Sequence, residues 1–369
     1  MTDTPKREQL YELIRANPFI SQQDLASRLG LSRSAVAGYI AGLIRERRLL
    51  GRAYVLPDRR PIVCIGAANI DRKLRPGARL LMGTSNPARQ DESFGGVARN
   101  IAENLARLGA HVGLVTAVGS DAGGAALLAH AERAGIDTRG TLRLDDACSG
   151  TYTAVLDQDG EMAVALADMA LYDQLTPAFF ATRQQQRAAA SLVVADLNLA
   201  RDAVAALLDD AVRDGVPIVV VAVSEPKMAH LPRALRGLRL LILNEGELAA
   251  RVGRELRTAP ELAAACDEVR AQGAQDIVVT RGARGVMYTT AGGVGQLEAP
   301  RVKIVDVTGA GDAFAAAVCW SLSQDDGNLA LACRRGLHLS ALTLACGQTV
   351  CPDLTPATFD DLPHLIDQD

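Results

Sequence analysis

The 369-residue sequence predicts an α/β fold, a mainly parallel sheet covered by helices on both faces, preceded by a small basic domain. Apolar runs of strand length alternate with alanine- and leucine-rich segments of helical spacing, the pattern of a parallel sheet buried on both faces. In LPDRRP two prolines bracket three charged residues, so we expect separate domains at residues 1–57 and 61–369. Residues 1–60 carry eleven basic and six acidic side chains, although the whole chain has a net charge of −4. This asymmetry indicates two modules with different partners.

Three helices are expected in the first domain, at Lys6–Ala16, Ser21–Leu29 and Ser32–Arg47. Apolar residues recur at helical spacing in the first and the third. The second and third begin at serines that can cap a helix, and Gly30 can take the left-handed conformation that the short turn between them needs. A short hairpin with Gly51 at its tip is expected after the third helix.

This three-helix unit with its trailing hairpin resembles the α+β winged helix-turn-helix domains of bacterial regulators. The resemblance makes the third helix a recognition helix and implies double-stranded DNA as a partner. The residues offered to DNA are Ser32, Arg33, Ser34 and Tyr39 on that helix and Arg52 on the hairpin. A helical module for protein contacts is the alternative, and the basic excess favours DNA.

The second domain is expected to begin with the strand Ile62–Ile70, followed by strands at 111–119, 191–197, 217–223, 238–244 and 276–282. Two polar, turn-rich segments, residues 71–94 and 141–168, depart from the alternation. The second contains Asp159-Gly160 between alternating stretches, which is a hairpin signal. We therefore expect the two segments to form a small β lid over the ends of the sheet.

Polar pairs follow two of the strands, at the ends where open α/β sheets bind ligands. Asn69 and Asp71 are two residues apart, so in an extended strand their side chains share a face and can hold a diol or cap a turn. Asn244 and Glu247 are three apart at a helix start, where they can organise a hydrated Mg²⁺ or form a helix cap.

Glycines at two places allow close approach of the backbone or a change of direction. Gly95-Gly96 precedes a helix with one apolar face, and Asn100 lies one turn into that helix. The pair can close on a ligand or form a tight turn. The segment from Thr280 through Gly282 and Gly285 lies at a strand end and can line a ligand site or serve as a plain turn.

The segment VDVTGAGDAFAAAV places Gly309, Ala310, Gly311 and Asp312 between a β-branched run and an alanine-rich helix. Backbone N–H groups at a helix N-terminus favour negative charge, so Asp312 can be a cap. The same N–H groups can hold a phosphate, with the carboxylate at the rim of that anion site.

Taken in order, these motifs resemble the ribokinase-like, or phosphofructokinase B, family of carbohydrate kinases from about Pro61 onwards. GGVARNIAENLARLG and DVTGAGD match its two signatures. The resemblance implies an ATP-dependent kinase that uses Mg²⁺ and, in many members, K⁺.

The resemblance also implies roles for particular residues. Asp312 would take the proton from a substrate hydroxyl, and the backbone of Gly309, Ala310 and Gly311 would stabilise the transferring phosphoryl group. The sugar would be held by Asn69, Asp71, Gly95, Gly96 and Asn100. The nucleotide would be held by Asn244, Glu247, Thr280, Gly282, Gly285 and Thr308, with Glu247 reaching Mg²⁺ through water and Asp306 near the K⁺ site.

Within the family the sequence is similar to the pseudouridine kinases, through IGAANID, TSNP, GEMAVALADM and VVADLN. This implies transfer of phosphate to the 5′-hydroxyl of pseudouridine, with Asn86 and Asp168 reading the base in the lid and Lys227 matching a substrate residue. Val221-Ala222 stands where those kinases have Asp-Pro. Another ribonucleoside or a ribose-like sugar is therefore the main alternative. A nucleoside-sensing transcription regulator with little turnover is a second, although the intact GAGD favours activity.

Composition excludes several other classes. The seven cysteines form no C-x-x-C pair and the five histidines show no ligand spacing, so we expect neither a disulfide framework nor a zinc site. No window can span a bilayer and the N-terminus has no apolar signal core, so we expect a cytoplasmic protein without membrane contact. Lids of related kinases pair across a dimer interface and dimeric helix-turn-helix proteins read palindromes, so we expect a homodimer.

Overall fold

The computed structural model describes residues 6–17, 20–50, 60–324 and 327–360. The chain divides into two compact units, Met1–Arg60 and Pro61–Asp369. Each unit has hydrophobic clusters of its own, one in the first unit and two in the second. We therefore describe them separately.

The first unit packs α1 (Lys6–Ala16), α2 (Gln22–Leu29) and α3 (Arg33–Arg45) around a small apolar core. Ser21 and Ser32 cap α2 and α3, accepting hydrogen bonds from the third amide beyond them at 3.0 and 3.1 Å. α3 ends two residues before the predicted Arg47, because Arg47 has a left-handed φ of 59° and the next two amides donate back to the Leu43 carbonyl. The predicted hairpin with Gly51 and Arg52 lies outside the described residues.

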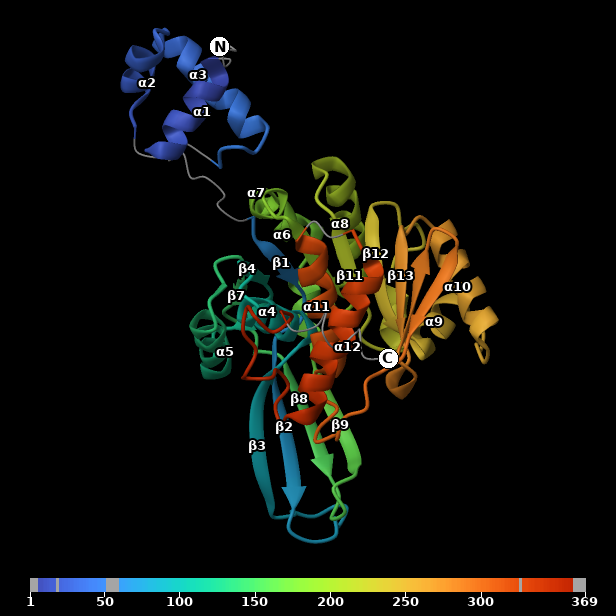
Figure 1. The fold of residues 1–369 in the computed structure, drawn as a ribbon. Helices are drawn as coiled ribbons and strands as arrows, with labels where there is room; N and C mark the ends of the chain where they lie inside the picture. The colour runs from blue at the N-terminus through green and yellow to red at the C-terminus, as the bar shows by residue number, and fades with distance from the viewer. Residues whose placement is uncertain (1–5, 18–19, 51–59, 325–326, 361–369) are drawn as a thin grey trace. The chain divides into compact units, whose positions relative to one another are not determined.

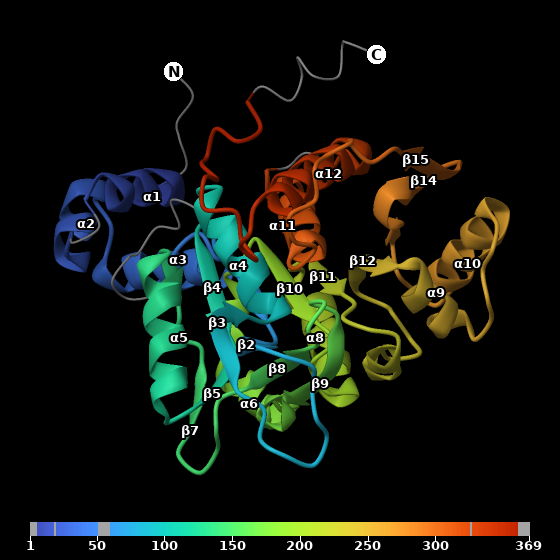
Figure 2. The same ribbon diagram turned by 90° about the horizontal axis from the view of Figure 1, so that it is seen from below.

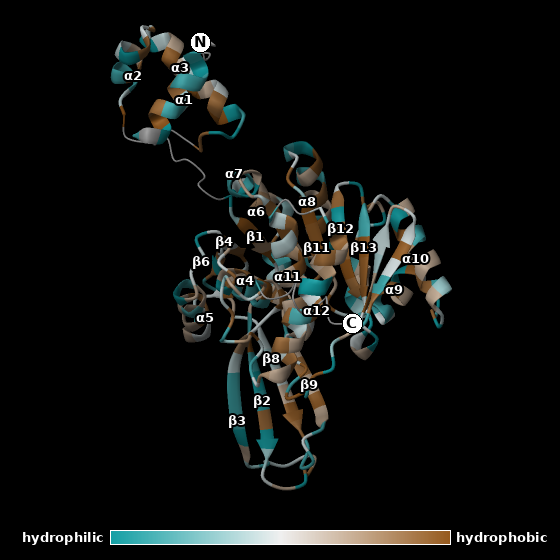
Figure 3. Cartoon of the chain, viewed as in Figure 1, coloured by the Kyte–Doolittle hydropathy of each residue, from teal (hydrophilic) through white to brown (hydrophobic). Residues whose placement is uncertain are grey.

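The second unit is built on a nine-stranded sheet of order β15-β14-β13-β12-β11-β10-β1-β4-β6 (Figure 1). The strands are β1 Ile62–Ile65, β4 Val112–Val115, β6 Ile136–Asp137, β10 Leu192–Asp196, β11 Ile218–Val221, β12 Leu238–Asn244, β13 Asp276–Thr280, β14 Val286–Thr290 and β15 Gly293–Leu297. Pairing is parallel from β13 to β6 and antiparallel at β14 and β15. The central strands are apolar along their length (Figure 3), as a sheet covered on both faces requires.

Helices cover both faces of this sheet. One face packs against α4 Val97–Arg107, α5 Ala122–Arg133, α11 Ala310–Ser323 and α12 Leu329–Ala345, and α11 and α12 lie side by side (Figure 2). The other packs against α6 Pro177–Thr182, α8 Arg201–Asp214, α9 Glu245–Val252 and α10 Ala259–Ala271, with α7 Gln184–Ala188 following α6. Short 3₁₀ turns complete the unit: η1 Ala170–Gln174, η2 Pro226–His230 and η3 Gly282–Arg284. No described helix is long and apolar enough to cross a bilayer.

A second sheet of four strands, β3-β2-β8-β9, extends beyond the main sheet and is called the lid (Figure 1). Its strands are β2 Asn69–Pro76, β3 Ala88–Gly95, β8 Thr151–Leu156 and β9 Met162–Asp168. The predicted lid segment 141–168 is only partly in it, because β7 (Leu142–Leu144) pairs with β5 (Ala117–Gly119) in a separate two-stranded sheet.

Two strands predicted as continuous are broken. The predicted strand 62–70 divides into β1 and β2, and 111–119 divides into β4 and β5. The first break is held by side chains from elsewhere: the Asp196 carboxylate accepts from Ala67 N at 2.9 Å, and Ala68 N donates to the Tyr172 hydroxyl at 3.1 Å. Hydrogen bonds to these distant side chains replace ladder bonds, so the chain leaves the main sheet and enters the lid.

Candidate active site

Asp312 lies in the first turn of α11, beside the glycine turn that precedes the helix. Gly309 is the N-cap residue of α11 and has a left-handed φ of 82°. A Cβ at this position would lie 2.1 Å from the Thr349 carbonyl oxygen, so both the conformation and the space require glycine. No side chain caps the helix. The start of α11 thus presents backbone N–H groups to an anion, next to a carboxylate.

The Asp312 carboxyl group lies in surroundings that disfavour its charge. Burial raises its pKa to about 7, and the carboxylates of Asp196 and Asp71 act in the same direction. A hydrogen bond from Asn100 Nδ2 to Asp312 Oδ2 at 2.7 Å opposes the rise, as does the charge of Arg99. A carboxylate with this pKa is suited to accept a proton at neutral pH.

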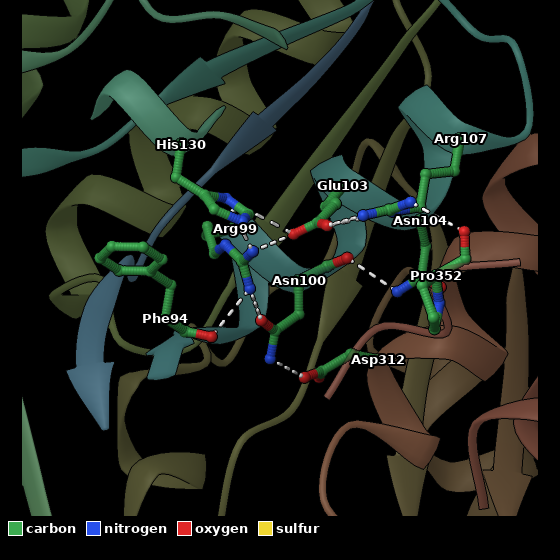
Figure 4. A network of polar contacts seen from close by, with 9 residues as sticks. All are labelled: Phe94, Arg99, Asn100, Glu103, Asn104, Arg107, His130, Asp312 and Pro352. Carbon is green, nitrogen blue, oxygen red and sulfur yellow. Dashed lines mark hydrogen bonds and ion pairs between the residues drawn. The ribbon is translucent and has the colours of Figure 1, made fainter. Parts of the chain in front are cut away.

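Asn100 connects Asp312 to a buried group of charges on α4 (Figure 4). Its Oδ1 accepts a hydrogen bond from Arg99 at 2.8 Å, and Arg99 also contacts Glu103. Arg107 donates to Glu103 Oε1 at 2.8 and 3.0 Å. Burial lowers the pKa of Arg99 to about 10, so it stays charged at neutral pH. Both ends of the Asn100 amide are therefore held. The sugar contact expected of Asn100 stays a prediction, and in the structure its amide is hydrogen-bonded to Asp312.

The predicted sugar-binding residues meet where the lid joins the main sheet. Asn69 Nδ2 donates to Asp71 Oδ1 at 2.6 Å, and burial raises the pKa of Asp71. Asn69 pairs with Gly95 across β2 and β3, and a Cβ on Gly95 would lie 2.1 Å from Asp71 Oδ2. The absence of a side chain at Gly95 therefore leaves room for the Asp71 carboxylate. Gly96, the next residue, is the N-cap of α4. An amide and a carboxylate held this way can bind adjacent hydroxyls.

The two lid residues predicted to read a base are placed differently. Asp168 pairs with Thr151, which also pairs with Ile70, so it lies at the base of the lid, two strands from β2, on the face that carries Ile70 and not on the face of Asp71. Asn86 lies beyond the far ends of β2 and β3, where its amide bonds Leu81 N, Leu81 O and Thr84 O at 2.8 to 3.1 Å. The structure does not bring Asn86 to Asp71, because the length of the hairpin separates them.

Two residues that the sequence analysis did not single out lie beside the predicted site residues. Asp196, at the end of β10, is 1 % exposed and accepts hydrogen bonds from Ala67 N and Ala98 N, both at 2.9 Å. Burial raises its pKa. Asn198 Oδ1 accepts from Lys227 Nζ at 2.6 Å, which brings the predicted Lys227 beside Asp196. A single carboxylate closing an otherwise apolar strand, in VVADLN, was the available signal.

The predicted nucleotide residues meet at the adjoining ends of β12 and β13. Asn244 pairs with Thr280 across these strands, and Gly282 and Gly285 form the turn that follows. Asn244 and Glu247 form a capping box, with Glu247 N donating to Asn244 Oδ1 at 2.8 Å and Asn244 N donating to Glu247 Oε2 at 2.7 Å. The helix-cap alternative is thus present in the structure. The magnesium role predicted for Glu247 stays a prediction, since the capping box uses only one of its carboxylate oxygens.

Asp306 holds the loop before Gly309. Its Oδ1 accepts from Thr308 N at 2.9 Å and from the Thr308 hydroxyl at 2.7 Å, and its Oδ2 accepts from Lys73 Nζ at 3.1 Å. Burial would raise the pKa of Asp306, but these bonds outweigh it and bring the pKa to about 2. The carboxylate is therefore ionised. No three acidic, histidine or cysteine side chains among the described residues form a metal cluster.

The residues predicted to contact DNA divide into two groups. Arg33 and Ser34 are exposed at the start of α3, whereas Tyr39 packs partly against the core of the first unit. Ser32 is occupied as the cap of α3 and lies 2.9 Å from Ser34 Oγ. Arg52 lies outside the described residues.

Comparisons with known protein families match the two units of the chain separately. The model of the pfkB family of carbohydrate kinases matches residues 59–355, and that of a winged helix-turn-helix DNA-binding domain matches residues 3–46. The sugar kinase YeiI of Escherichia coli K12 is 31% identical over 356 residues, covering 95% of this chain and 96% of its own. The pseudouridine kinase of the same organism is 33% identical over 304 residues, covering 82% of this chain and 96% of its own.

Two solved structures are similar in fold. Arabidopsis thaliana ribokinase, complexed with ribose and ATP, has a TM-score of 0.73 at 19% identity, covering 84% of this chain and 99% of its own. Phosphofructokinase-2 of Escherichia coli, in complex with potassium, has a TM-score of 0.67 at 19% identity, covering 84% of this chain and 100% of its own.

Proposed function

Because the chain belongs to the pfkB family of carbohydrate kinases, we propose that it is an ATP-dependent kinase that phosphorylates the 5′-hydroxyl of pseudouridine. The observation that carries the kinase assignment is Asp312 beside the Gly309 turn at the start of α11, with its pKa raised to about 7. Base and anion site are adjacent, as transfer of a phosphoryl group to a hydroxyl requires.

In the proposed reaction, Asp312 accepts the hydroxyl proton as the hydroxyl oxygen bonds to the γ-phosphorus of ATP. The bond between that phosphorus and the bridging oxygen breaks, and ADP leaves. Backbone N–H groups of Gly309 to Gly311 stabilise the charge on the transferring group. Mg²⁺ would neutralise phosphate charge, held mainly by the nucleotide and by Glu247 through water.

The substrate assignment rests on the residues around Asp71 and on the relatives. The Asn69 and Asp71 pair can bind the two ring hydroxyls of a ribose. The pseudouridine kinase of Escherichia coli is 33% identical over most of this chain. Because Val221-Ala222 stands where pseudouridine kinases have Asp-Pro, another ribonucleoside or a ribose-like sugar is the competing substrate.

Potassium does not fit the residue predicted to bind it. Asp306 Oδ2 accepts from the Lys73 ammonium and Oδ1 from Thr308. A second cation at Asp306 would meet this ammonium at close range, and like charges repel strongly at such distances. No step of the proposed reaction therefore involves potassium.

We further propose that the first unit binds double-stranded DNA and that the chain forms a homodimer. Arg33 and Ser34 at the start of α3 support DNA contact, as does the match to a DNA-binding domain model.

Val164 and Leu166 on one face of β9 support dimerisation, because they are 48% and 65% exposed. Both DNA and ATP are found in the cytoplasm, which is the location we propose.

A panel of phosphate acceptors tests the function: pseudouridine, uridine, inosine, cytidine, adenosine, ribose and fructose, with ATP and Mg²⁺. We expect pseudouridine to give the highest kcat/KM. Preference for another member of the panel would replace the substrate and keep the mechanism. Nucleoside binding without turnover would instead support a sensor and contradict the kinase assignment.

A further inference from the structure

We infer that the Lys73 ammonium serves as a built-in monovalent cation beside the anion site, so that phosphoryl transfer by this chain is independent of potassium. The inference rests on the proposed function, and it names Lys73 as a positioning residue. Lys73 lies on β2 in the lid and Asp306 lies 233 residues later, yet their charged groups are 3.1 Å apart. Neither residue is on the main sheet. Lys73 is on the lid strand that carries Asp71, and Asp306 is in the loop before α11.

The position of Lys73 follows from the strand that carries it. Side chains two residues apart on a strand share a face, so Lys73 lies on the same face of β2 as Asp71. That face meets the loop before α11. The side chains of Lys73 and Asp306 are only 36% and 32% exposed. Water and salt therefore screen their attraction less than they would screen a fully exposed ion pair.

Asp306 in turn fixes the start of α11. Its Oδ1 binds the N–H and hydroxyl of Thr308, the residue directly before Gly309. An ionised carboxylate so near an anion site would repel a phosphate unless a cation neutralised it. The Lys73 ammonium supplies that positive charge and leaves Oδ1 free to hold the loop.

The other basic groups nearby are committed elsewhere. Lys73 and Asp306 border a cavity of about 590 Å³ that also contacts residues 347–350. Arg75 on the cavity wall pairs with Asp91, and Arg99 and Arg107 pair with Glu103. Among the described basic residues that line this cavity, Lys73 alone forms an ion pair with Asp306.

The test compares K73M with R72M, a matched control. Arg72 is the neighbouring residue on β2, 37% exposed and 3.1 Å from Glu92, but it lies on the opposite face. Turnover is measured with the best substrate of the panel in NaCl and in KCl at equal ionic strength. We expect equal rates in both salts for the natural chain and for R72M. K73M should lose about tenfold in NaCl and recover most of that loss in KCl or ammonium chloride.

A second readout needs no substrate. A cation that binds only the folded state raises the melting temperature, so K73M should melt higher in KCl than in NaCl whereas the natural chain should not. K73R keeps the positive charge and should behave as the natural chain. This readout remains informative if no acceptor in the panel is phosphorylated.

Two results would overturn the inference. One is several-fold activation or stabilisation of the natural chain by potassium, a measurement that does not depend on any variant folding. The other is a loss in K73M that is the same in both salts, which would make the Lys73 contact purely structural.

Discussion

Asp312, the proposed base, links the proposed chemistry to the stability of the fold. Its pKa is near 7 in the folded chain, against 3.8 for a free side chain, so the folded state binds this proton more tightly than the unfolded state does. With respect to this group, stability is highest below pH 3.8 and falls as the pH rises towards 7. The chain is therefore least stabilised where the base is ionised and active.

Replacing Asp312 with Asn should abolish turnover, by about a thousandfold or more, because no carboxylate remains to accept the proton. The amide oxygen can still accept from Asn100, so the fold and nucleoside binding should persist. Single-turnover kinetics and equilibrium binding measure the two effects. Normal turnover by D312N would remove Asp312 from the mechanism.

The same variant tests the link to pH. D312N carries no buried ionisable group at this position, so its gain in melting temperature over the natural chain should be larger at about pH 8 than at about pH 5. Calorimetric scans of both proteins at the two pH values provide the comparison. A gain that does not depend on pH would mean that burial leaves the pKa of Asp312 near its ordinary value.

Local sequence is enough for some site residues and insufficient for others. Asn69 and Asp71 come together because alternation along one strand places them on one face. The hydrogen bond between Asn100 and Asp312 could not be predicted from the sequence, since the two residues are 212 positions apart. Asp196 was missed for the same reason, because it binds amides 98 and 129 residues away. Such contacts depend on how the strands are ordered in the sheet.

At the scale of elements, the junction of β2 and β3 decides whether Asp71 can take its position. Periodicity predicted most strands of the main sheet, because runs of apolar residues mark strands buried on both faces. It could not place the break between β1 and β2, which depends on Asp196 and Tyr172. Nor could it separate β7 from the lid, because short strands carry little periodic signal.

Gly95→Ala should lower kcat/KM for the sugar by about tenfold or more, because the added methyl would displace the Asp71 carboxylate. Gly77→Ala, in the same hairpin, is the control, since a Cβ at Gly77 meets nothing within 4 Å. Steady-state kinetics of both variants measure the difference. Equal kinetics for the two would show that Asp71 does not need this position.

At the scale of the molecule, the two units have separate hydrophobic cores. Removing residues 1–57 should therefore leave a folded kinase with nearly unchanged kcat/KM and no DNA binding. Circular dichroism, the kinase assay and fluorescence anisotropy with DNA test the three parts. Loss of kinase activity in the shortened chain would mean that the first unit contributes to the site.

The proposed dimer is also a property of the whole molecule. Leu166→Lys places a charge on the exposed apolar face of β9 and should shift the protein towards the monomer. Val212→Lys on α8 is the control, because Val212 is 45% exposed and lies outside the lid. Light scattering reports the mass of each variant, and an unchanged dimer in L166K would place the interface elsewhere.

Joining the two units in one polypeptide fixes their ratio. Every copy made adds one first unit, which we propose binds DNA, and one kinase unit, so the cell cannot alter the amount of one without the other. If the first unit acts on its own gene, the number of occupied operators and the capacity to consume substrate rise and fall together. Expression noise is then shared by both activities, which two separately encoded proteins could not guarantee.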